Sequence, residues 1–198
     1  MTDRRVDRRT VTIAGHTGDV AVARAGLTSP DPAVRAAALG ALERLDRLTD
    51  DDLRGALTDA AVPVRRRAAE LSARHLDVDL VATLSDPDTR VAEVAAWACG
   101  EHESNRDAVV ETLIDLARNA EEALVREAAV AALGAIGDDR AVEVIVAACS
   151  DKPAVRRRAV LALAPFDGPD VDAAVEGALT DRDWQVRQAA EDLRRAQT

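Results

Sequence analysis

Aromatic residues are nearly missing from this 198-residue chain, which has no tyrosine, one phenylalanine and two tryptophans. Hydrophobic residues nevertheless make up 47% of it. A core must therefore be built from alanine, valine and leucine, which favours helices packed at close range. No segment alternates apolar and polar residues as a strand does, apart from a possible extended stretch at Val11–Ala14. We therefore predict an all-α protein.

Positive charge is scarce, because Lys152 is the only lysine and the formal net charge is -10. Such an acidic protein is not expected to bind nucleic acid through non-specific attraction to phosphates. Charged residues still make up 31% of the chain and are mixed with apolar ones, which is typical of a folded chain rather than a disordered one.

Cysteines and long apolar runs are also scarce. Cys99 and Cys149 lie in apolar helical segments, which predicts free buried thiols in a reducing compartment rather than a disulfide framework. No apolar run has the length of a membrane span, and the charged N-terminus lacks the apolar stretch of a secretory leader. These features predict a cytoplasmic protein without a membrane partner.

What the chain does contain is a repeat of about 30 residues. Each unit has an anchor valine, and these are Val34, Val64, Val91, Val125, Val155 and Val186. The residue four positions after the anchor is always alanine: Ala38, Ala68, Ala95, Ala129, Ala159 and Ala190. The residue after the anchor is arginine in every unit except the third, where it is Ala92. We expect the alanines to form a buried seam between neighbouring helices.

Each unit reads as an anchor helix, a turn and a second, shorter amphipathic helix. The shorter helices are predicted at residues 50–57, 77–84, 107–117, 138–149 and 171–179. Gly134 and Gly137 are assigned to a turn that ends an anchor helix. Aspartates precede the anchors and are expected both to cap helices and to meet the anchor arginine of an adjacent unit: Asp31, Asp59, Asp86, Asp151 and Asp181.

Segments such as LVREAAVAALGAIGDDRAVEVIV and LTDRDWQVRQAAEDL resemble HEAT repeats, of the short kind found in bilin-lyase-type proteins. The resemblance covers roughly residues 19–197 and implies a right-handed α-solenoid of about six two-helix repeats. It divides the chain into an N-terminal arm, residues 1–18, and a HEAT-like repeat domain, residues 19–198. It also implies that the anchor helices line the concave surface, where such arrays bind their partners.

Helical periodicity then predicts which anchor-helix residues face that surface. The candidate partner-binding residues are Arg66, Arg67, Glu93, Trp97, Glu101, Glu127, Arg157 and Arg158. Trp97 is central and flanked by charge, which is typical of a binding hot spot, although a place in the core is the alternative. Arg156 is assigned to the contacts between units, and Trp184 is expected to pack against the preceding unit.

The sequence contains no recognisable catalytic or metal-binding site. His16, His75 and His102 show no paired spacing, and the surface positions that hold His-Glu pairs in HEAT-type deoxyhypusine hydroxylases carry no histidine here. No chromophore site of a bilin lyase, nucleophile with its base, or glycine-rich phosphate loop is recognisable. We predict no catalytic residues, no metal and no cofactor.

The predicted function is therefore a non-catalytic scaffold or adaptor that binds a segment of another protein on its concave face. The alternative is nucleic-acid binding in the manner of HEAT-like DNA glycosylases, which combine a tryptophan, a carboxylate and arginines on that face. Trp97, Glu101 and the arginine pairs are similar in kind, but Glu93, Glu101 and Glu127 would oppose phosphates.

Overall fold

The computed structural model describes residues 7–102 and 107–196, and all regular structure in these ranges is helical. This confirms the predicted all-α class and the α-solenoid architecture. The chain divides into two compact units, residues 1–79 and 80–198.

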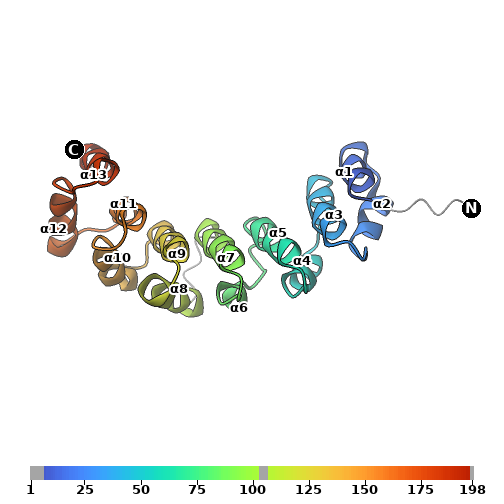
Figure 1. Ribbon diagram of the computed structural model, residues 1–198, viewed down its shortest axis with the longest axis horizontal. Coiled ribbons are helices and arrows are strands. Elements are labelled where there is room, and N and C mark those ends of the chain that lie inside the picture. The colour runs from blue at the N-terminus through green and yellow to red at the C-terminus, as the bar shows by residue number, and fades with distance from the viewer. Residues whose placement is uncertain (1–6, 103–106, 197–198) are drawn as a thin grey trace, which may run out of the picture. The chain divides into compact units, whose positions relative to one another are not determined.

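The first unit contains five helices that form two rows (Figure 1). The helices are α1 (Arg8–Thr17), α2 (Val20–Gly26), α3 (Pro32–Arg44), α4 (Asp50–Leu57) and α5 (Val62–Ser72). Helices α1, α3 and α5 pack side by side in one row, and α2 and α4 cover them from the other.

The second unit continues the same two-helix pattern. Its elements are α6 (Val81–Leu84), α7 (Thr89–Glu101), α8 (Asp107–Asn119), α9 (Ala123–Ile136), η1 (Asp139–Ala141), α10 (Val142–Ala148), α11 (Pro153–Ala162), α12 (Pro169–Ala178) and α13 (Trp184–Ala196). The anchor helices α7, α9, α11 and α13 form one row, and α6, α8, α10 and α12 form the other (Figure 1).

Two local predictions were wrong. The stretch Val11–Ala14 is not extended but belongs to α1, because Asp7 caps that helix through a 2.7 Å bond from the Thr10 backbone N–H, and Gly18, at φ 84°, ends it. The helix predicted at residues 77–84 is reduced to α6, because Val78 and Leu80 are buried from non-helical backbone.

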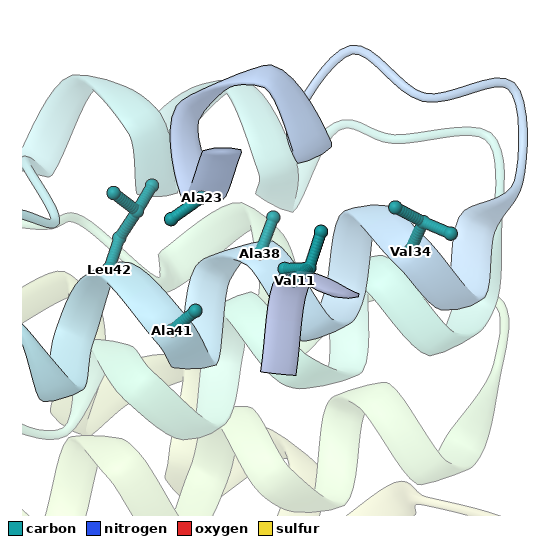
Figure 2. Packing of buried hydrophobic residues seen from close by; sticks show 6 residues of the cluster. All are labelled: Val11, Ala23, Val34, Ala38, Ala41 and Leu42. Atoms are coloured by element: carbon teal, nitrogen blue, oxygen red, sulfur yellow. The ribbon is translucent and has the colours of Figure 1, made fainter. Parts of the chain in front are cut away.

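Helix α1 is held by a small apolar cluster in the first unit (Figure 2). The cluster consists of Val11 from α1, Ala23 from α2, and Val34, Ala38, Ala41 and Leu42 from α3. Glycine allows this close packing, because a methyl group at Gly26 would lie 2.9 Å from atoms of both Val11 and Ala38. Residues 8–17 are thus packed on the first unit, while the division of the chain at residues 18 and 19 stays a prediction.

The alanine seam is confirmed. All six predicted alanines have 0% of their surface exposed, and all six anchor valines are buried. Gly134, however, is not a turn residue: it lies inside α9, and a methyl group there would be 2.6 Å from Cα and Cβ of Ala162 on α11. Only Gly137, at φ 70°, ends the helix as predicted. Small side chains therefore set the distance between neighbouring anchor helices.

The predicted contacts between anchor arginines and aspartates of the next unit are present at three steps. Each arginine donates two hydrogen bonds to one carboxylate, in the pairs Arg35–Asp59, Arg126–Asp151 and Arg156–Asp181, at 2.6–2.8 Å. The same guanidinium groups also donate to backbone carbonyls of the turn before their own helix, such as Ser29, Ala120 and Asp151. Each arginine thereby joins two successive turns.

The predicted capping role of the turn aspartates holds only for Asp31, whose carboxylate accepts from the Ala33 N–H at the start of α3. The N-cap positions of α5, α9 and α11 are Ala61, Glu122 and Lys152, and none of their side chains caps. The aspartates lie earlier in the turns, where they accept a backbone N–H and remain accessible to the arginine of the preceding unit.

A histidine joins three elements of the first unit. His75, which follows α5, is hydrogen-bonded through Nδ1 to Asp50 Oδ1 (2.8 Å) and through Nε2 to Glu43 Oε2 (3.1 Å). Arg74 approaches Glu43 at 3.7 Å and Arg54 approaches Asp50 at 4.0 Å. Partial burial lowers the pKa of His75, but the hydrogen bonds and charges of the two carboxylates outweigh it, so the pKa is raised overall.

We expect the contribution of His75 to stability to depend on pH. Because the pKa is higher in the folded than in the unfolded chain, this contribution is fully present below about pH 6.5 and is lost as the pH rises through the raised value. The free energy of unfolding of wild type minus that of His75→Gln should therefore be larger at about pH 5.5 than at about pH 8.5. Urea titrations at both pH values measure it, and an equal difference at both would contradict the assignment.

Candidate functional site

A pocket of about 450 Å³ opens on the anchor-helix row of the second unit. Its charged and aromatic lining comes from three neighbouring anchor helices: Glu93, Trp97 and Glu101 from α7, Glu127 from α9, and Arg158 from α11. These five were all predicted from the sequence as partner-binding residues, and the structure brings them together.

Trp97 is the aromatic wall of this pocket and is 45% exposed. It points outward because α7 already buries its opposite side through Val91, Ala95 and Ala98. The seam leaves no space for an indole, so Trp97 is a surface residue and not part of the core.

The side of the pocket formed by α7 is acidic. Glu93 and Glu101 lie one helical turn before and after Trp97, on the same face of the helix. Neither carboxylate has an ion-pair partner among residues 7–102 and 107–196. The tryptophan is therefore flanked by two uncompensated negative charges.

The opposite side carries Arg158, whereas Arg157, its neighbour in sequence, does not line the pocket. Oε1 of Glu127 lies 4.0 Å from Nη2 of Arg157 and 3.7 Å from Nε of Arg158. Both distances are beyond that of a good hydrogen bond. The Nε–H of Arg158 is buried and has no hydrogen-bond acceptor among the described residues. An unsatisfied buried donor of this kind costs free energy.

The other three predicted residues do not line the pocket: Arg157 lies on α11, and Arg66 and Arg67 lie on α5 in the first unit. Arg66 is exposed, whereas Arg67 pairs with Glu70 at 2.9 Å. The guanidinium of Arg67 also lies over Gly40 of α3, where a methyl group would come within 2.6 Å of Nη2. Their part in binding stays a prediction.

Two hydrophobic residues differ from what the sequence suggested. Leu124 lines the pocket and is 48% exposed, although only its position directly before an anchor valine could have singled it out. Trp184 was expected to pack against the preceding unit, and this was wrong: it is the first residue of α13 and is 64% exposed.

Comparison with protein families identifies the repeat. The model of HEAT repeats matches residues 78–153 and again residues 110–194, which together span more than half of the chain. The chain belongs to the HEAT-repeat family. A comparison with curated proteins finds no significant match.

Solved structures with similar folds are also repeat proteins. One is the complex of CpcE and CpcF of phycocyanin lyase from Nostoc sp. PCC7120. The matched chain is 24% identical in sequence to this HEAT-repeat chain, with a TM-score of 0.63, and the match covers 86% of this chain and 74% of the other. An engineered protein is 22% identical, with a TM-score of 0.59 over 94% of this chain and 60% of the other. A designed armadillo repeat protein in complex with the peptide (KR)4 is 16% identical, with a TM-score of 0.50 over 96% and 87%. These similarities show the fold.

The described residues of the chain offer few groups for metal binding, thiol chemistry or membrane insertion. No group of three or more histidine, cysteine, aspartate or glutamate side chains there is arranged to hold a metal ion. Neither Cys99 nor Cys149 is in a disulfide with a described residue, and burial raises the pKa of Cys149 to about 11, which keeps it a thiol near neutral pH. None of the helices in residues 7–102 and 107–196 could cross a membrane.

Proposed function

We propose that the chain is a non-catalytic interaction module that binds a segment of another protein at the pocket around Trp97. The observation that carries this proposal is the half-exposed indole in a pocket whose floor consists of small side chains such as Ala128, Ala131 and Ala132. A large aromatic residue beside exposed Leu124 offers apolar surface, and the charged rim offers polar contacts. This combination is typical of an interface hot spot.

The fold is compatible with this role. Repeat solenoids bind along the extended surfaces formed by successive units. Two of the similar solved structures are complexes, one of CpcE with CpcF and one of a designed armadillo repeat protein with the peptide (KR)4. They support protein binding as the class of activity and leave the partner to be identified.

Nucleic acid is the second candidate, favoured by the arginines Arg66, Arg157 and Arg158. The carboxylates of Glu93 and Glu101 oppose it, because phosphates would meet two uncompensated negative charges beside Trp97. A titration of labelled duplex DNA at low and physiological salt decides between them. Binding that is lost in the Arg157→Glu/Arg158→Glu variant and falls steeply with salt would favour the nucleic-acid function.

To test protein binding, a library of displayed random peptides is selected on the wild-type protein. Peptides from this selection should lose about 2 kcal/mol or more in binding free energy, roughly 30-fold in Kd, on Trp97→Ala. The matched control is Trp184→Ala, which removes the other exposed indole outside the pocket and should leave Kd unchanged.

Thermal melts followed by circular dichroism show whether the Trp97→Ala variant is folded. An unchanged Kd in a folded Trp97→Ala protein would place the binding surface elsewhere, on the second helix row or the turns between units. A selection that yields no specific peptide would reject the proposed function.

A further inference from the structure

We propose that the pocket recognises a lysine or arginine side chain of the bound segment, held beside Trp97 between Glu93 and Glu101. This inference rests on the proposed function and specifies the chemistry of the partner. It follows from how charge is distributed within the pocket.

The acidic side of the pocket supplies the cation site. An exposed indole attracts a cation to its ring face, and more strongly when the cation is desolvated. Glu93 and Glu101 lie one turn on either side of Trp97 and have no ion-pair partner in the described chain, so each can add an ion pair to that cation. A carboxylate at this position would instead face two like charges.

The pocket also has the size for such a group. Its volume of about 450 Å³ lies within the range of small-ligand sites, and its lining includes the small residues Gly100, Ala131 and Ala135 beside the half-exposed Trp97. The aliphatic stem of a lysine or arginine has Leu124 as an apolar neighbour. The occupant is therefore a basic side chain within a peptide rather than a free inorganic cation.

The test uses the full chain with Trp184→Phe, so that indole fluorescence reports Trp97 alone. Two synthetic octapeptides are titrated, one of alternating lysine and serine and one of alternating glutamate and serine. The basic peptide should change the fluorescence saturably, and the acidic one should not.

The double variant Glu93→Gln/Glu101→Gln should raise the Kd of the basic peptide about tenfold. Glu111→Gln/Glu121→Gln changes the net charge equally at exposed positions outside the pocket and should have little effect.

Equal binding of both peptides, no saturable binding of the basic one, or equal effects of the pocket and control carboxylate variants would overturn this inference. The proposed function is judged separately, because peptides selected from the random library can depend on Trp97 without being basic. Failure of the lysine peptide alone therefore rejects the cation site and leaves the interaction module standing.

Discussion

Replacing Arg156 with alanine is expected to lower the free energy of unfolding by about 3 kcal/mol. Arg156 is 6% exposed and donates from Nε and Nη2 to the two carboxylate oxygens of Asp181, and from Nη1 to the carbonyl of Asp151. The substitution leaves a largely buried carboxylate and a turn carbonyl without their donors. Removal of one partner of such a pair is far more destabilising than the pair itself is stabilising.

The arginine run itself supplies the control. Arg157 is adjacent in sequence but 39% exposed at its side chain, and its nearest carboxylate oxygen lies at 4.0 Å. Arg157→Ala should therefore change stability by no more than about 0.5 kcal/mol. Urea denaturation of both variants measures the difference, and equal losses would mean that Arg156 has no special role between units.

The effect of Arg156→Ala should also depend on pH. The hydrogen bonds from Arg156 lower the pKa of Asp181 below its ordinary value of 3.8. Because the pKa is depressed in the folded chain, the stabilisation is present above about pH 4 and is lost as the pH falls through the lowered value. The difference between wild type and variant should shrink in strongly acidic buffer.

Replacing Ala129 with leucine is expected to lower the free energy of unfolding by about 2–3 kcal/mol, at the upper end of the usual range for overpacking. Ala129 has no exposed surface, and its helix α9 approaches α11 so closely that even a methyl group at Gly134 would be 2.6 Å from Ala162. The three added carbon atoms must therefore push neighbouring helices apart.

The same substitution on the exposed side of the helix is the control. Ala135→Leu on α9 adds the same volume beside the open pocket and should cost less than about 0.5 kcal/mol. Chemical denaturation of both variants checks this. Equal stability of Ala129→Leu and wild type would show that the seam has space, and the explanation for its alanines would be wrong.

Much of the fold was predictable because it repeats. An alanine at the same position of every unit, such as Ala68 or Ala159, is explained if neighbouring units pack against each other at that position. The arginine that follows each anchor was assigned to contacts between units for the same reason, and Arg35, Arg126 and Arg156 form them. Helix α1 was missed because it lacks the repeated segment, although Asp7 and Gly18 mark its ends.

The candidate site was predictable only in part. Periodicity along α7 places Glu93, Trp97 and Glu101 on one exposed face without any knowledge of the neighbouring helices. Leu124 was missed because it precedes its helix's anchor, and exposure there depends on how the turn meets α7 and α9. The predicted packing of Trp184 against the preceding unit was wrong, because that prediction assumed that a bulky apolar side chain in a turn is buried.

The sequence by itself determined the class of this protein: an acidic, aromatic-poor array of HEAT repeats with an alanine seam and arginine–aspartate contacts. Local periodicity suffices for these features, because each is repeated and each is read from one helix or one turn. Only the tertiary structure decided that side chains from α7, α9 and α11 line one pocket, and that the Nε–H of Arg158 is buried without an acceptor among residues 7–102 and 107–196. Both depend on distances between successive helices, and these distances are set by close contacts such as that of Gly134 with Ala162.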